Sequence, residues 1–176
     1  MGFFPRLAPE NGDTAIGRLD RIRDIVRGSK FGIHDLSRCQ AAVVGEYARM
    51  NMPFELGMDY GCAKFGNGAL KQKSFLILEE RRFDYHRALS DISGWDIHHH
   101  GGDFVRAVRI VSDWLVRQAS ADAIGPSRIQ GNYATFQEWY YERELDRGAS
   151  EDDIKSYPTQ KVIAAMREWM DACGQF

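Results

Sequence analysis

Hydrophobic residues along the chain follow two spacings, one typical of helices and one typical of buried strands. From about Gly17 to Arg27 they recur every three or four positions, which predicts an amphipathic helix that stops at Gly28 and Ser29. A short apolar stretch over about 30–35 follows at once and predicts a strand whose last residues are polar. A helix followed directly by a strand is half of an alternating α/β unit.

A second helix and a second strand follow the same pattern. Pro53 fits the first turn of a helix, where its missing N–H costs nothing, and this helix should end near 66–68. The stretch 74–78 contains four consecutive apolar residues, which is typical of a parallel strand covered on both faces. Two such strands with a helix between them predict a right-handed crossover, with a site at their carboxyl ends.

The remaining segments are mostly helical in pattern. We expect no more than an edge strand over 1–8, a loop with some helix over 40–49, a short helix over 82–93 and a last strand over 96–98. A clear helix is predicted over 103–118, with Asp103 as its N-cap. Two further helices carry apolar residues at helical spacing: Ile129, Tyr133, Phe136 and Tyr140 in one, and Val162, Ile163, Met166, Trp169, Met170 and Cys173 in the other.

These elements predict an α/β fold of flavodoxin-like type, with a short parallel sheet flanked by helices and a helical C-terminal third. We expect one domain over residues 1–176, comprising an α/β part over about 1–120 and a helical part over about 121–176. A chain of 176 residues is long enough for one domain with a real core and too short for two large ones.

Charge and cysteine content narrow the function classes. The 23 basic and 25 acidic residues nearly cancel and neither sign forms a block, so we expect no nucleic-acid partner. No apolar run approaches the roughly 18 residues that span a bilayer, and the first residues lack a secretory pattern, so we expect no membrane contact and a cytoplasmic location. The three cysteines are far apart and predict neither a disulfide framework nor a zinc site.

Glu55 is the strongest candidate for chemistry. It lies near the expected start of the second helix, where the helix dipole favours an ionised carboxylate. An ionised carboxylate can capture or stabilise the oxocarbenium character that develops when an N-glycosidic bond breaks. With Met52 as cap and Pro53 as first helical residue, Glu55 would also stand at the third helical position, where glutamate caps helices. Spacing alone leaves both interpretations open.

Polar residues at the end of the first strand form the second candidate. Asp35 can bind ribose hydroxyls, as acidic residues do in nucleotide sites, or it can cap the turn that follows. Ser37 comes next, and Arg38 can either meet a phosphate bidentately or lie on the surface. Asn51 and Phe54, beside Glu55 in the sequence, complete the predicted substrate-binding set.

Three other sequence patterns give no strong indication of a catalytic or binding site. The run 98–100 is three adjacent histidines, which lack the spacing of metal ligand sets, so we interpret it as a solvated loop and predict no metal site. The glycines at 66–68 with Lys71 lack the phosphate-loop pattern and predict a turn. An aromatic series without interleaved basic residues predicts core or a partner-facing surface: Tyr133, Phe136, Trp139 and Tyr140.

Four stretches resemble a group of small bacterial TIR-like proteins, which are related in fold to the nucleoside 2-deoxyribosyltransferases. The resemblance covers roughly residues 2 to 140 and is most specific in the sequence Met-Pro-Phe-Glu-Leu-Gly. The stretches are Ser29–Arg38, Asn51–Gly57, Lys73–Leu78 and Ser90–Ile97.

The resemblance implies a flavodoxin-like sheet, a catalytic glutamate carried onto Glu55, and cleavage of the glycosidic bond of NAD or a related nucleotide, often in antiviral defence. No cofactor is expected beyond that nucleotide as substrate. The similar proteins begin with another strand and helix, and we expect this chain to start too late to include them. A sheet edge exposed in this way would favour self-association into a homo-oligomer. The missing strand and the aromatic series keep open a non-catalytic nucleotide-sensing or assembly module, and a nucleoside deoxyribosyltransferase is a third alternative.

Overall fold

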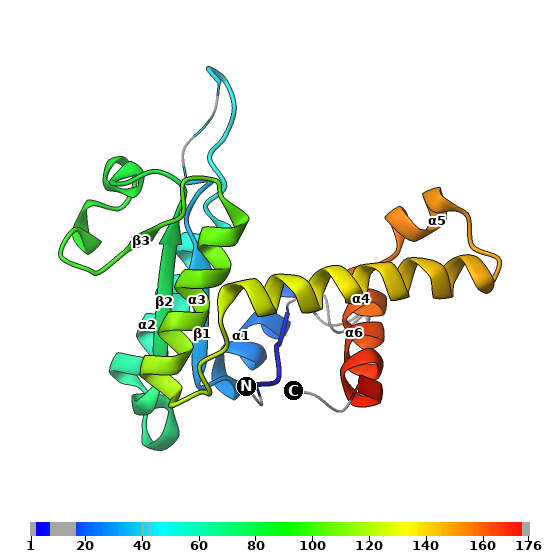
Figure 1. Cartoon of the computed structure of the whole chain (residues 1–176). Coiled ribbons are helices and arrows are strands. Elements are labelled where there is room, and N and C mark those ends of the chain that lie inside the picture. The colour runs from blue at the N-terminus through cyan, green and yellow to red at the C-terminus, as the bar shows by residue number, and fades with distance from the viewer. Residues whose placement is uncertain (1–2, 8–16, 40, 42, 174–176) are drawn as a thin grey trace. The chain divides into compact units, whose positions relative to one another are not determined.

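The computed structural model describes residues 3–7, 17–39, 41 and 43–173 (Figure 1). The chain divides into two compact units. One comprises Asp13–Ser120, and the other comprises Met1–Gly12 together with Ala121–Phe176. The first unit is an α/β fold of flavodoxin-like layout and the second is helical, so the predicted fold class is confirmed.

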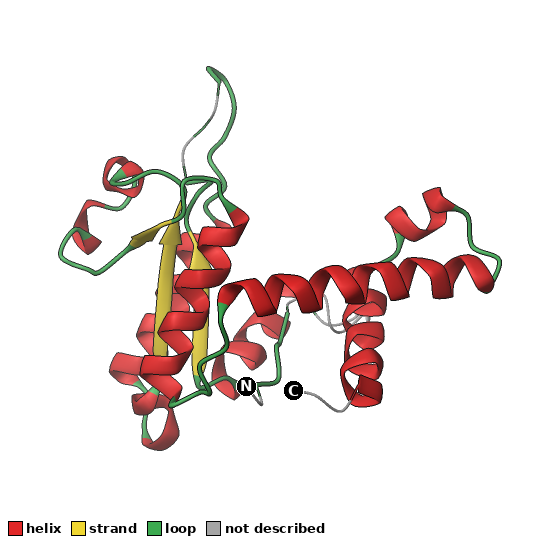
Figure 2. Ribbon diagram, viewed as in Figure 1, coloured by secondary structure: helices red, strands yellow, loops and turns green. Residues whose placement is uncertain are grey.

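Three parallel strands form the centre of the α/β unit, in the order β1-β2-β3 (Figure 2). Phe31 pairs with Ser74 at the start of the first ladder, and Leu78 pairs with His98 in the second. The carboxyl ends of parallel strands lie at one edge of a sheet. The elements of this unit are α1 (Arg18–Gly28), β1 (Phe31–Asp35), α2 (Asn51–Phe65), β2 (Ser74–Glu79), β3 (His98–His99), α3 (Phe104–Ala119) and three short 3₁₀ helices (Gly68–Gln72, Asp84–Arg87, Ser90–Ile92).

Helices cover both faces of this sheet, as the unbroken apolar run of β2 predicts. Leu76 and Leu78 pack against Trp114 of α3 on one face. Ile77, which points to the opposite face, packs against Leu56 of α2. In Figure 1, α3 covers one face of the sheet, and α1 and α2 lie on the other. Residues one apart on a strand therefore face different helices.

The helical unit contains α4 (Pro126–Asp146), α5 (Glu151–Ser156) and α6 (Thr159–Cys173). Pro126 stands in the first turn of α4, and Ser150 forms a capping box with Asp153 at the start of α5. The core of this unit is formed by Phe136, Tyr140, Ala165 and Trp169, which confirms that part of the predicted aromatic series is core.

Several boundaries differ from the sequence predictions. The last strand is His98–His99 and not 96–98, and the single helix expected over 82–93 is two short 3₁₀ helices. Phe83, at φ = 69°, takes a left-handed conformation just before the first of them, which a continuous helix cannot contain. Residues 3–7 form no strand and residues 43–50 no helix; the rest of these two predicted segments lies partly outside the described residues.

The structure confirms the predicted bounds of α1, β1 and β2 and the predicted N-cap of α3. Asp103 caps α3, accepting hydrogen bonds from the backbone N–H groups of Val105 and Arg106 at 2.8 and 3.3 Å. Helix α1 and strands β1 and β2 begin and end within a residue of the predicted bounds. Within the described ranges, no helix is both long enough and apolar enough to cross a membrane.

Candidate functional site

The carboxyl ends of the three strands bring together polar groups from distant parts of the sequence. Strand β1 ends at Asp35, β2 ends at Glu79, and β3 is followed directly by His100. The backbone N–H of His100 donates to the carbonyl of Glu79 at 2.9 Å, which continues the ladder by one residue. This edge is where ligands bind in open α/β sheets, so its side chains form the candidate site.

Asp35, Ser37 and His100 form a hydrogen-bonded cluster at this edge. The Ser37 backbone N–H donates to Asp35 Oδ1 at 3.0 Å, and the Ser37 hydroxyl donates a short hydrogen bond to the same oxygen. His100 Nε2 lies 3.0 Å from Ser37 Oγ and 3.5 Å from Asp35 Oδ2. The His100 side chain is 12% exposed and that of Asp35 is 49% exposed, so the carboxylate reaches solvent while the imidazole supports it.

This arrangement corrects the interpretation of 98–100 as a solvated loop. His98 and His99 are the two residues of β3, both are half-buried, and His100 contacts the cluster. Strand alternation places His98 and His100 on one face and His99 on the other, so the three rings cannot converge. The described part of the chain contains no group of three or more His, Cys, Asp or Glu side chains that could hold a metal ion.

Glu79, at the end of the central strand, was not among the predicted site residues. It is 1% exposed, and its Oε1 accepts a hydrogen bond from the backbone N–H of Phe83 at 2.9 Å. Burial, with a contribution from the charge of Glu79, raises the pKa of the Tyr85 hydroxyl. Glu79 therefore holds the left-handed turn at Phe83.

Glu55 lies in α2, further into the helix than predicted. The N-cap is Met50, so Pro53 is the third helical residue and Glu55 the fifth. The capping interpretation of Glu55 is therefore wrong, because its carboxylate stands beyond the position of a capping box. Glu55 is half-buried and, among the described residues, forms no hydrogen bond or ion pair.

A buried network one turn further along α2 joins the helix to the sheet. Asp59, 2% exposed, accepts from His34 Nε2 at 3.0 Å and pairs with Lys73 Nζ at 3.0 Å. Lys73 also donates to the carbonyl of Val26 at 2.6 Å and, in a shorter hydrogen bond, to that of Ser29. The network thus connects β1 and α2 with the end of α1 and the residue before β2.

The partners of Asp59 determine its charge. Burial by itself raises the pKa of this carboxyl, but the hydrogen bonds from His34 and Lys73 and the Lys73 charge lower it by more. The net pKa lies below the usual value, so Asp59 is ionised. Gly32 makes room for it, because a Cβ at this position would collide with Asp59 Oδ2.

The other predicted substrate-binding residues lie on α2 or just after β1. Arg38 is exposed, and its carbonyl accepts from the backbone N–H of Arg49 at 3.0 Å. Asn51, the first residue of α2, is exposed, and the Phe54 side chain is 56% exposed. In the described residues, no side-chain hydrogen bond or ion pair joins Arg38, Asn51 or Phe54 to Asp35.

The thiol of Cys39 is not reactive. Burial, reinforced by the charge of Asp35, raises the pKa of the Cys39 thiol to about 11, so it stays protonated. The described chain contains no disulfide, and its three cysteines are free.

Gly66 follows the end of α2 and Gly68 begins a 3₁₀ helix, so this segment is a connection between α2 and β2.

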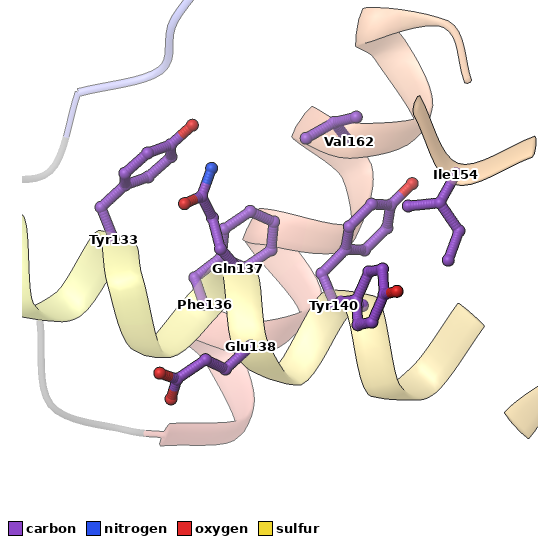
Figure 3. A pocket seen from close by; sticks show the side chains of 8 residues that line it. Tyr133, Phe136, Gln137, Glu138, Tyr140, Ile154 and Val162 are labelled. Carbon is purple, nitrogen blue, oxygen red and sulfur yellow. The ribbon is translucent and has the colours of Figure 1, made fainter. Parts of the chain in front are cut away.

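The helical unit contains a separate pocket of about 480 Å³ (Figure 3). Its walls are largely aromatic and aliphatic, and come from α4, α5 and α6. Figure 3 shows Tyr133 and Gln137 extending from the same side of α4, with Ile154 and Val162 across the hollow. The lining residues are Tyr133, Phe136, Gln137, Glu138, Tyr140, Tyr141, Ile154 and Val162.

Comparisons with known proteins give no relative. No protein-family model, curated protein or solved structure matches this chain.

Proposed function

We propose that the chain is an N-glycosidase that cleaves the glycosidic bond of NAD or a related nucleotide at the carboxyl edge of the sheet. The observation that carries this proposal is a pair of carboxylates near that edge, Asp35 and Glu55, neither of which pairs with a lysine or arginine among the described residues. Asp35 stands at the end of β1 with half of its side chain in solvent. Glu55 stands near the start of α2 without an internal partner among the described residues.

Glu55 is placed by the residues on either side of it. Met52 and Leu56 pack with Leu36 and Tyr85, which follow β1 and β2 respectively, so the first turns of α2 lie beside the carboxyl ends of these strands. One turn later, Asp59 is tied to His34 of β1. A helix anchored at these two levels gives the backbone of Glu55 a defined position, which supports a role for its carboxylate as nucleophile.

In the proposed reaction, the Glu55 carboxylate attacks the anomeric carbon as the bond to the base breaks. The electron pair of that bond leaves with the base. Nicotinamide departs from NAD as a neutral molecule and needs no proton. Water then attacks the same carbon: its hydroxyl stays on the sugar, its other proton passes to solvent, and the bond to Glu55 breaks. This gives ADP-ribose from NAD and restores the carboxylate.

The remaining predicted residues contact the substrate without taking part in bond cleavage. Asp35 and Asn51 bind ribose hydroxyls, and Ser37 holds Asp35. Arg38 binds a phosphate, since its exposed guanidinium lies next to the cluster in sequence. Phe54 offers an exposed ring for the base. Because α2 covers one face of the sheet and Asp35 points to the other, the substrate would lie across the strand ends.

The test is release of free base from NAD, NADP and nucleosides by purified protein, followed by liquid chromatography. Glu55→Gln keeps the shape of the side chain and removes its charge, and should lower the rate by about 100-fold or more. Glu142→Gln changes an exposed glutamate of α4 and should leave the rate unchanged. Equal rates for wild type and Glu55→Gln would exclude Glu55 as nucleophile.

A non-catalytic nucleotide-sensing or assembly module is the second candidate. It is favoured by the absence, among the described residues, of any hydrogen bond or ion pair between Glu55 and the Asp35 cluster. Such a module would bind nucleotide or self-associate without releasing base. Transfer of the sugar to a second added base would instead indicate a nucleoside deoxyribosyltransferase. A role in bacterial defence predicts that expression depletes cellular NAD only when Glu55 is intact.

A further inference from the structure

The hydrogen bonds of the two ring nitrogens of His100 indicate its neutral tautomer. Nδ1 accepts a hydrogen bond from the backbone N–H of Gly102 at 3.1 Å, so in the neutral ring the proton is on Nε2. This bond depends on the turn after β3, where Gly101 and Gly102 have φ values of 68° and 74°. Nε2 therefore donates toward Ser37 Oγ.

The direction of these hydrogen bonds excludes one interpretation of the cluster. Asp35, Ser37 and His100 have the composition of a catalytic triad, but a triad histidine must accept the serine proton. Here His100 donates to the Ser37 hydroxyl, and that hydroxyl donates to Asp35 Oδ1. Ser37 is consequently not activated as a nucleophile, and the cluster holds a carboxylate in place.

The hydrogen bonds that the Asp35 carboxylate can still accept indicate which chemical group it binds. Asp35 Oδ1 already accepts the backbone N–H and the hydroxyl of Ser37. Among the described residues, the one polar partner of Oδ2 is His100 Nε2 at 3.5 Å, and the carboxylate is half exposed. An ionised carboxylate only accepts hydrogen bonds, so the open oxygen takes hydroxyl or ammonium donors and repels phosphate. Two adjacent sugar hydroxyls supply two such donors to one carboxylate, as in nucleotide sites where an acidic residue follows a strand.

We infer that Asp35, held by Ser37 and His100, binds the vicinal diol of a ribose, so that the site takes ribonucleotides in preference to 2′-deoxyribonucleotides. This inference rests on the proposed function and names its substrate class. His100 is then a positioning residue, acting on the sugar through Ser37 and Asp35.

Base-free sugars separate this inference from catalysis. We would titrate ¹⁵N-labelled protein with ribose 5-phosphate and with 2-deoxyribose 5-phosphate and follow the backbone amide signals of residues 35–38 and 100–102. The two sugars share a phosphate, so any contribution of Arg38 cancels. Ribose 5-phosphate should bind about ten-fold more tightly, because the deoxy sugar leaves a charged acceptor without its donor.

Three variants and a control identify the groups responsible. Asp35→Asn and His100→Ala should remove the preference for ribose 5-phosphate. His100→Gln should retain it, because the glutamine amide can still donate to Ser37. Asp91→Asn, at an exposed aspartate of the same unit, should behave as wild type. Signal dispersion in the same spectra shows whether each variant is folded.

The inference would be overturned if the protein bound the two sugars equally or bound neither of them. It would also be overturned if the preference for ribose 5-phosphate remained in Asp35→Asn. Failure of the proposed function gives a different result. Ribose binding without base release from any nucleotide would refute the glycosidase and leave the diol site standing. Base release at equal rates from ribonucleosides and deoxyribonucleosides would refute the diol site and leave the glycosidase standing.

Discussion

Lys73→Met tests the buried network that ties α2 to the sheet. Methionine matches the length of lysine but removes the ammonium group. The variant leaves the ionised, 2%-exposed carboxylate of Asp59 without its cation and removes a donor from the carbonyls of Val26 and Ser29. Removing one partner of a buried ion pair costs about 3–5 kcal/mol. This loss is a large part of the 5–15 kcal/mol that stabilises a typical domain.

The assay is urea denaturation combined with native-state hydrogen exchange of the β1 and β2 amides, which reports on the α/β unit alone. Lys71→Met is the matched control, since Lys71 is exposed and lies two residues away in the preceding 3₁₀ helix. It should change the free energy of unfolding by no more than about 0.5 kcal/mol. Adding Asp59→Asn to Lys73→Met should restore at least about 1 kcal/mol, because the unpaired charge is gone.

Acidity gives an independent test of the same network. The pKa of Asp59 is lower in the folded than in the unfolded chain, so its ionised form contributes stability above the unfolded-state value near 4. That contribution should be lost as the pH falls below about 4 and through the folded-state pKa.

One result of the denaturation assay would refute the reasoning about this network. If Lys73→Met lost no more stability than Lys71→Met, Asp59 would not be a buried, paired carboxylate.

Three further substitutions test separate parts of the structure. Gly32→Ala should destabilise the α/β unit by about 1–3 kcal/mol in urea denaturation, because the new Cβ meets Asp59, and Asp59→Ala should therefore cost less stability in the Gly32→Ala chain than in the wild type. Asp103→Ala should cost about 1 kcal/mol in the same assay by removing the cap of α3, whereas Asp103→Asn should cost less. Lys161→Met should lower the thermal midpoint of the helical unit, since Lys161 Nζ pairs with the buried Glu144 at 2.6 Å; an unchanged midpoint would mean that Arg143 suffices.

Local pattern predicted most of the α/β unit, because its strands and helices bury regular faces. The run Phe75–Leu78 indicated a strand covered on both sides, and Asp103 indicated the start of α3. Positions set by long-range contacts were missed. The start of α2 two residues before Pro53 has no cap signal, and β3 is only two residues long.

The candidate site was predicted unevenly for the same reason. Asp35 and Ser37 are adjacent to an apolar run, so a strand end could be inferred from the sequence. His100 comes from 63 residues further along and joins them only through parallel pairing. Asp59 and Lys73 belong to residue types that usually lie on surfaces, and nothing in their own segments indicates that they meet in the interior.

Strand β1 connects the two polar clusters of the α/β unit. His34 and Asp35 are neighbours on this strand, so their side chains point to opposite faces of the sheet. His34 reaches into the network that anchors α2, and Asp35 enters the cluster with Ser37 and His100. A shift of β1 by one residue would exchange these faces and break both clusters at once. The buried network therefore does more than stabilise the fold: it fixes the register on which the exposed carboxylate at the sheet edge depends.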